Sequence, residues 1–249
     1  MTRYDRVFYE HVTRAALQSA RVVLPMVRSL LPVRSVVDFG CGEGAWLAVW
    51  RELGVERTTG VDGSFVDLDR LLSPREDFVL GDLGGPFDLS REFDLVQSLE
   101  VAEHLPPESA ETYVETLVHH GPVILFSAAV CGQGGHGHLN ERPYEYWRSM
   151  FAARGYSAFD PFRRALARDR RVSPWYRYNL LLYASEEGVN AHRALAAHRI
   201  PEDRAVPDLA PALYQLRRFA LRRLPGALVT RLAQVKEMKS VVSARMTGR

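Results

Sequence analysis

The stretch that decides the fold is Val36-Val37-Asp38-Phe39-Gly40-Cys41-Gly42-Glu43-Gly44. Its β-branched residues favour an extended strand, and its glycines allow a tight turn in which the backbone can approach a ligand closely. A helical pattern follows through Leu53. A strand that enters a glycine-rich turn and then a helix is typical of the ligand-binding start of a doubly wound sheet. Dinucleotide-binding proteins share this logic, but their spacing is G-x-G-x-x-G, whereas here an acid precedes G-x-G-x-G.

The rest of the chain alternates strands with helices. Strands are predicted at 35–39, 58–61, 78–80, 93–98, 122–127, 157–159 and 179–184, with helices at 107–119 and 143–154. This alternation predicts an α/β fold with a Rossmann-like, doubly wound, mostly parallel seven-stranded sheet. Helical spacing over 4–31, interrupted near Pro25, predicts an N-terminal helical cap within residues 1–32.

The pattern changes after Ser185. Residues 186–206 predict helix and loop, and residues 208–245 predict a basic helix broken at Pro225-Gly226. We therefore divide the chain into a domain over 1–185 and a helical extension over 186–249. Residues 187–249 hold twelve Lys and Arg against five Asp and Glu, although the whole chain has a net charge of only +2. A basic extension predicts contact with an anionic surface or another subunit, through a homodimer or a peripheral membrane contact.

The composition excludes several classes of protein. A hydrophobic content of 47% and a charged content of 25% are those of an ordinary globular protein. Two cysteines, Cys41 and Cys131, make no disulfide framework. The polar start and the lack of any apolar run near ~18 residues argue against a signal peptide and a transmembrane segment, so we expect a cytoplasmic protein. The low net charge argues against a nucleic-acid partner.

Acidic residues stand at the ends of the first three predicted strands, at Asp38, Asp62 and Asp82. A carboxylate at the end of the second strand can accept hydrogen bonds from both hydroxyls of a ribose. Asp82 could meet the exocyclic amine of an adenine. A single acid would be explained as the cap of the next helix, but three at consecutive strand ends predict an adenosine-containing cofactor.

These residues resemble the class I S-adenosylmethionine (SAM) dependent methyltransferases over residues 4–185. The glycine turn matches their first motif, Asp62 their second-strand acid, Asp82-Leu83 their adenine contact, and Phe93-Asp94-Leu95-Val96 with the residues that follow it their fourth-strand motif. Tyr4, Phe8-Tyr9 and residues 132–147 are similar to a bacterial subgroup of these enzymes (Methyltransf_23-like). The resemblance implies a SAM-dependent enzyme, with SAM bound by Asp38, Gly40, Cys41, Gly42, Gly44, Asp62, Gly63, Asp82, Leu83 and Glu100.

Two histidines are candidate catalytic residues. Methyl transfer is an in-line displacement, and it needs a base only when the acceptor must lose a proton of high pKa. His104 follows the fourth predicted strand, and His138 lies in a glycine-rich segment beyond the fifth. Ligands bind at the carboxyl ends of the strands in such sheets, so we expect both histidines to face the cleft.

A metal site is the sharper hypothesis for the same region. Glu100, Glu103 and His104 are spaced i, i+3, i+4, which puts them on one face if the stretch is helical. Glu-x-x-Glu-His with a later His resembles the metal site of the small-RNA 3′-end 2′-O-methyltransferases, and a similar Glu-x-x-Glu-His occurs in ubiquinone-pathway O-methyltransferases. The resemblance implies that Glu100, Glu103, His104 and His138 bind Mg²⁺, Mn²⁺ or Zn²⁺. A metal-free histidine base and a mechanism without catalytic histidine remain alternatives.

The favoured function is O-methylation of a hydroxyl on a small-molecule acceptor, such as a sugar, a glycan precursor or a specialised metabolite. An RNA ribose 2′-O-methyltransferase is the alternative enzyme, supported by the Glu/Glu/His/His resemblance and the basic tail. A SAM-binding scaffold without methyl transfer is the third reading.

Overall fold

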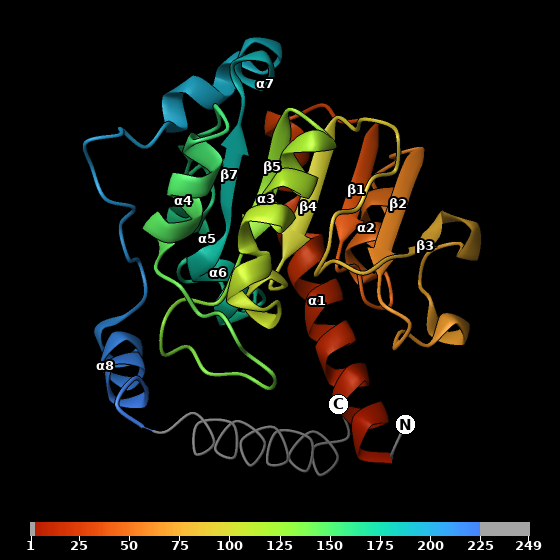
Figure 1. The fold of residues 1–249 in the computed structure, drawn as a ribbon, viewed down its shortest axis with the longest axis horizontal. Helices are drawn as coiled ribbons and strands as arrows, with labels where there is room; N and C mark the ends of the chain where they lie inside the picture. Colours follow the sequence, from red (N-terminus) through yellow and green to blue (C-terminus); the bar gives the residue numbers. More distant parts are fainter. Residues whose placement is uncertain (1–2, 225–249) are drawn as a thin grey trace.

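A computed structural model describes residues 3–224, and side chains from Val12 onward. Its centre is a seven-stranded sheet with the order β3-β2-β1-β4-β5-β7-β6 (Figure 1). The strands from β3 to β5 are parallel, and β7 runs antiparallel to both β5 and β6. The predicted Rossmann-like sheet is therefore confirmed. The strands are β1 Ser35–Phe39, β2 Arg57–Asp62, β3 Phe78–Leu80, β4 Leu95–Leu99, β5 Val123–Ser127, β6 Ser157–Phe159 and β7 Leu181–Ala184.

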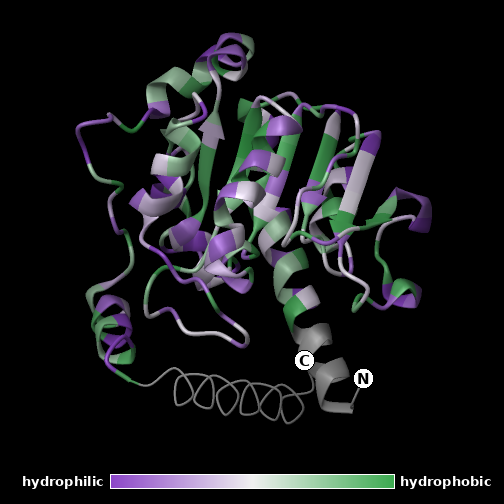
Figure 2. Cartoon of the chain, viewed as in Figure 1, coloured by the Kyte–Doolittle hydropathy of each residue, from purple (hydrophilic) through white to green (hydrophobic). Residues whose placement is uncertain are grey.

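Helices cover both faces of the sheet. They are α1 Arg3–Leu30, α2 Ala45–Glu52, α3 Ala110–His119, α4 Tyr144–Ala152, α5 Arg163–Leu166, α6 Pro174–Asn179, α7 Glu186–Ala191 and α8 Ala212–Leu221. Buried residues of β5 alternate between two clusters, because successive side chains of a strand point to opposite faces. Val123 and Leu125 pack with α1 and α2, whereas Ile124 and Phe126 pack with α3 and α4. Strands β1 and β5, in the middle of the sheet, are accordingly coloured mostly as hydrophobic (Figure 2).

The parallel strands end at the lower edge of the sheet in Figure 1. Strand β1 has β2 on one side and β4 on the other, so the strand order reverses there. Ligands of open α/β sheets bind beside this reversal. The two segments that carry the sequence motifs, 40–44 after β1 and 100–104 after β4, both lie at this point.

Three details of the predicted elements are wrong. Helix α1 continues through Pro25, because Val23, Leu24 and Val27 are fully buried and their packing compensates for the lost backbone hydrogen bond. The fourth strand begins at Leu95 rather than at 93, since the Asp94 carboxylate accepts the backbone N–H groups of Arg34 and Ser35 at the start of β1. The last strand begins at Leu181, because helix α6 occupies residues 174–179.

The C-terminal extension packs against the body of the protein. Leu195, Ile200 and Val206 are buried in the two core clusters. Arg148 of α4 is also buried, and it donates to three backbone carbonyls of residues 200–204. The chain then runs down to α8, which lies at the end of the sheet where the parallel strands end (Figure 1). Of the predicted basic helix, α8 falls within the described residues and the part beyond 224 lies outside them. Over residues 3–224 no helix combines the length and apolar content needed to cross a membrane.

The stability of the fold should depend on pH through His120. This ring is fully buried, its Nδ1 lies 2.7 Å from the Thr116 carbonyl oxygen, and its Nε2 accepts the Leu89 N–H at 2.9 Å. The Nδ1–H donates to the carbonyl in either protonation state, but Nε2 can accept the Leu89 N–H only while the ring is neutral, and burial lowers the pKa of His120. Below about pH 6.5 His120 becomes protonated in the unfolded chain while it stays neutral in the native protein. The free energy of unfolding therefore falls as the pH falls.

Denaturant unfolding between about pH 7 and pH 5 checks this expectation. His120→Gln should lose less stability over this range than the parent protein, because glutamine does not titrate. His136→Gln, at an exposed position that makes no contact with His120, should keep the slope of the parent. Equal slopes for the parent and His120→Gln would contradict the assignment.

Candidate active site

Asp62 ends β2 and faces the glycine turn. Its Oδ2 accepts the N–H of Gly42 at 2.6 Å, and its Oδ1 accepts the N–H of Gly63 at 2.7 Å. Burial raises the pKa of this carboxyl, and the two backbone N–H groups oppose the rise. Each carboxylate oxygen retains a further lone pair. Asp62 can therefore fix the turn and still accept hydrogen bonds from a ribose.

Asp38 lies deeper than Asp62, at the end of β1. Only 2% of the residue is exposed, and burial raises its pKa to about 7. Gln97, its register partner in β4, opposes this rise, and the nearby charge of Asp62 adds to it. Asp38 is therefore enclosed within the sheet and does not border the open space beside the turn.

Gly42 is the glycine of the turn that borders open space. Its φ of +54° favours glycine, and a Cβ added there would meet no atom within 4 Å. A Cβ at Gly40 would instead meet Val101, and one at Gly44 would meet Ser73. The open space beside Gly42 and the carboxylate of Asp62 form a cradle that suits the polar part of SAM. Cys41 is buried and its thiol faces Gly60.

Exposed apolar side chains surround this cradle. Leu80 ends β3 next to Asp62 in the sheet register and is 63% exposed, and Phe65 is 65% exposed with its ring over Gly63. Asp82 is exposed and accepts the N–H of Gly84, while Leu83 is buried. An apolar rim beside a carboxylate suits a flat ring such as adenine. The sequence interpretation missed Phe65 and Leu80, although an aromatic residue three positions after the second-strand acid could have indicated the first.

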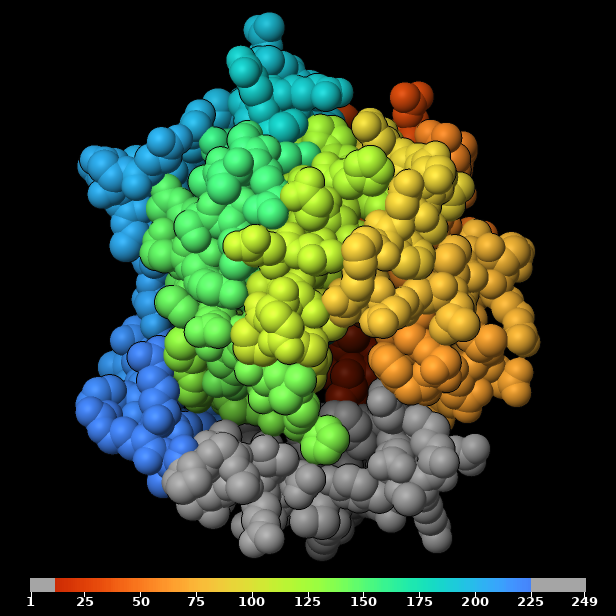
Figure 3. Space-filling model, viewed as in Figure 1, coloured from red at the N-terminus to blue at the C-terminus, as the bar shows by residue number. Residues whose placement is uncertain are grey.

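Helix α1 closes one side of the cradle through Glu43. The Glu43 carboxylate accepts a hydrogen bond from Thr13 Oγ1 at 2.7 Å and another from Arg70 Nε at 2.6 Å. These contacts join the glycine turn to α1 and to the segment after β2. The surface is hollowed between the orange and yellow-green parts of the chain, with α1 at the base of the hollow (Figure 3).

Glu100, the first residue after β4, does not lie on a helix. Its φ is +57°, a left-handed conformation that costs a non-glycine residue about 1–3 kcal/mol. Its carboxylate accepts hydrogen bonds from Gln133 Nε2 at 2.8 Å and from Asn179 Nδ2 at 3.3 Å. The predicted helical face is therefore wrong, because only Ala102–His104 forms a short 3-10 helix. The amide pair was not predicted either.

Three of the four predicted metal ligands come together beside Glu100. Glu103, His104 and His138 each offer an atom, and these atoms all lie within 4.8 Å of one another. Both carboxylate oxygens of Glu103 are buried and have no hydrogen-bond partner among the described residues. Burial and the neighbouring Glu100 raise the pKa of Glu103 well above its usual range. Partial removal from water and the nearby His138 lower the pKa of His104, whose ring remains open to solvent on one side.

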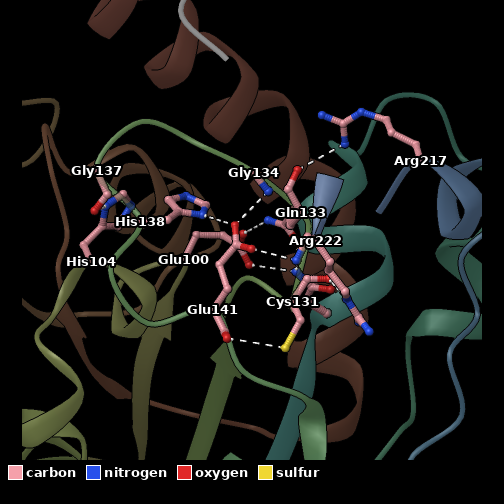
Figure 4. Close-up of polar contacts among 12 residues, drawn as sticks. Glu100, His104, Cys131, Gln133, Gly134, Gly137, His138, Glu141, Arg217 and Arg222 are labelled. Carbon is pink, nitrogen blue, oxygen red and sulfur yellow. Dashed lines mark hydrogen bonds and ion pairs between the residues drawn. The ribbon is translucent and has the colours of Figure 1, made fainter. Parts of the chain in front are cut away.

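The β5–α4 loop, residues 128–143, places His138 in this cluster. The backbone N–H groups of Leu139 and Asn140 both donate to the Glu103 carbonyl oxygen, so the loop folds back over the end of β4. His138 Nδ1 lies 2.8 Å from Glu141 Oε1, which leaves Nε2 free to bind a ligand (Figure 4). Glu141 also accepts the N–H groups of two glycines of the loop, and sequence reasoning did not identify it. The ring packs against Gly135, where an added Cβ would lie 2.1 Å from Nε2.

This geometry can do two kinds of chemistry. The edge at β1 and β2 can hold a nucleoside, and the edge at β4 and β5 can hold a cation or move a proton. Since the two sites flank the reversal of strand order, a group bound at one would face a group bound at the other.

Comparisons with known proteins agree with this arrangement. Residues 9–160 match a family model described as a methyltransferase domain. A search of the curated proteins found no match. Among solved structures, the sugar N-methyltransferase KedS8 from Streptoalloteichus sp ATCC 53650 is 19% identical with a TM-score of 0.53, over 68% of this chain and 87% of that one.

Two further solved structures share the fold. The methyltransferase domain of bacterial CtHen1-C is 20% identical with a TM-score of 0.51, over 68% of this chain and 98% of that one. The magnesium protoporphyrin IX methyltransferase ChlM from Synechocystis PCC 6803, with bound SAM, is 19% identical with a TM-score of 0.51, over 69% and 80% of the two chains. The family match covers more than half of the chain, and the cradle of Gly42 and Asp62 suits the cofactor. The chain belongs to the methyltransferase domain family and is a class I SAM-dependent methyltransferase.

Proposed function

We propose that the protein transfers the methyl group of SAM to a hydroxyl oxygen of a small molecule, with a divalent metal ion bound by Glu103, His104 and His138. The observation that carries this proposal is the buried carboxylate of Glu103, whose two oxygens have no hydrogen-bond partner among the described residues and which lies beside two imidazoles. A carboxylate charge that is neither solvated nor paired is costly to bury, which is why the pKa of Glu103 is raised. A cation at this point would satisfy it.

The donor set fits Mg²⁺, Mn²⁺ or Zn²⁺. Glu141 orients His138, as carboxylates commonly do for metal-binding histidines. We retain Glu100 as a fourth ligand, because its oxygens keep lone pairs beyond the hydrogen bonds from Gln133 and Asn179. When bound, a divalent ion would lower the pKa of an acceptor hydroxyl.

The SAM side of the cleft follows from the first three strands. Asp62 would hold the ribose, Gly42 would let the backbone approach the cofactor, and Leu83 with the exposed acid Asp82 would border the adenine. Glu100 and Cys41 complete the proposed SAM contacts. The residues of the chain thereby hold the two reactants in line and exclude water, which is the main contribution of protein to a displacement of this kind.

A small-molecule acceptor is supported by the charge and by the similar folds. Before residue 187 the chain is slightly acidic, and KedS8 and ChlM are named for a sugar and a porphyrin acceptor. RNA is the second candidate, because the clustered Glu103, His104 and His138 match the pattern that resembles the small-RNA 2′-O-methyltransferases. The third reading is a scaffold that binds SAM without transferring its methyl group.

Methyl-labelled SAM with either a metabolite extract or total RNA separates these functions. We expect label on the oxygen of a small product, loss of transfer with a chelator, and recovery when Mn²⁺ is added. Labelled RNA would favour the second candidate, and SAM binding without transfer to either acceptor pool would favour a scaffold. If a chelator leaves methyl transfer unchanged, a role for the metal ion is rejected. If the label is found on nitrogen, O-methylation is rejected.

Gly135→Ala should weaken metal binding without unfolding the protein. The new Cβ would displace the His138 ring, because it would lie 2.1 Å from Nε2. Disturbing the support of a metal ligand typically costs about 10–100-fold in affinity, and calorimetry with Mn²⁺ would measure this. Gly85→Ala is the matched control, since a Cβ there meets nothing within 4 Å. Equal affinities for the two variants would show that His138 is not a ligand.

A further inference from the structure

Helix α8 carries its large apolar residues on its outer face. Leu213, Leu216 and Phe219 are 82%, 62% and 53% exposed, and Leu224, just beyond the helix, is 37% exposed. The spacing i, i+3, i+6 keeps the first three on one side of the helix. A surface helix normally turns such a stripe toward the core. Contiguous exposed apolar side chains mark a surface that binds something.

The inner face of α8 is held to the body of the protein, mainly by polar contacts. These contacts oppose a rotation of the helix about its axis that would bury the apolar residues. Arg218 is buried and pairs with Asp208. The ring of Tyr214 packs 5.7 Å from that of Tyr178. Two more arginines bind the β5–α4 loop: Arg217 donates to the Gln133 carbonyl at 3.1 Å, and Arg222 donates to the Cys131 carbonyl at 2.9 Å (Figure 4).

The charges on and after α8 indicate what the outer face meets. The guanidinium of Arg223 lies 3.6 Å from the centroid of the Phe219 ring, within the apolar face. In a protein interface this charge would be buried and would need an acidic partner. At a lipid surface it can stay at the level of the phosphates while its stem lies among apolar groups. Residues 212–249 hold nine Lys and Arg against one Glu, so this end of the chain attracts anionic surfaces.

We propose that the outer face of α8 docks the protein on an anionic lipid membrane. Leu213, Leu216 and Phe219 enter the interface between headgroups and acyl chains, and the arginines meet the lipid phosphates. A second copy of this chain is the disfavoured occupant, because pairing two such faces would bring Arg223 of each copy into an apolar contact. The proposal concerns where the enzyme binds and does not depend on the metal site or the acceptor.

Vesicle flotation of the full chain tests the proposal. We expect flotation with vesicles of phosphatidylcholine and phosphatidylglycerol, little with phosphatidylcholine alone, and less at high salt. The double variant Leu216→Glu/Phe219→Glu should lower the affinity for the anionic vesicles at least about tenfold, because two apolar contacts are lost and two repulsive charges are added. Arg223→Gln should lower it by a smaller factor.

The matched control is Ala196→Glu/Ala197→Glu, which adds the same charges at exposed positions of the short helix Arg193–His198. It should float like the parent, and thermal unfolding should show that all variants are folded. Absence of flotation with anionic vesicles, or equal flotation by the α8 double variant, would overturn the proposal. The face would instead be assigned to a second copy if the parent protein sediments as a dimer and does not bind vesicles, and if only the α8 double variant is a monomer.

Discussion

Glu103→Gln is expected to abolish specific Mn²⁺ binding and to lower turnover about 10²-fold or more. Glutamine has nearly the same shape but lacks the negative charge of the only carboxylate in the close group of Glu103, His104 and His138. Without a cation the parent protein buries a carboxyl group that has no hydrogen-bond partner among the described residues and whose pKa is raised. An uncharged amide is easier to bury, so the variant should unfold no more easily than the metal-free parent.

Loss of function without loss of stability is the signature to look for. Calorimetry with Mn²⁺ gives the affinity, and thermal unfolding in the presence of a chelator gives the stability. Glu108→Gln, at an exposed position five residues away, should change neither. If Glu103→Gln binds Mn²⁺ as the parent does, the cluster is not a metal site.

Asp62→Ala is expected to weaken SAM binding at least about tenfold, a loss of ~1.5–3 kcal/mol. The substitution removes an acceptor for ribose hydroxyls, and it also releases the N–H groups of Gly42 and Gly63 that now bind its carboxylate. Asp69→Ala is the matched control, because that carboxylate is exposed and its ion pair with Arg75 is long, at 4.0 Å. Unchanged affinity in calorimetry with SAM would overturn the placement of the cofactor.

Much of the cofactor side could be predicted because it depends on local rules. A strand, a glycine turn and a strand-end acid lie close together in sequence, and parallel strands bring Asp38 and Asp62 to one edge without further information. The neighbourhood of Glu100 could not be predicted in this way. Gln133 and Asn179 reach it from elements 33 and 79 residues away, and the left-handed backbone at Glu100 breaks the helical spacing.

The boundary at Ser185 shows a different limit. After Ser185 the sequence becomes more basic and no longer alternates strands with helices. The division into a domain and an extension remains a prediction. Packing does not follow the change, because Leu195 has no exposed surface and Arg148 binds carbonyl groups of the extension. Periodicity describes one helix or strand at a time, so it does not indicate which segments share a core.

Gln133 belongs to two neighbourhoods at once. Its backbone carbonyl accepts Arg217 of α8, and its side chain binds Glu100 and Asn179. Whatever binds the outer face of α8 and whatever binds in the cleft therefore act on a common residue. Thermodynamic reciprocity then sets a strict rule: if an occupant of α8 changes the affinity of the cleft for a ligand by some factor, that ligand changes the affinity of α8 for its occupant by the same factor.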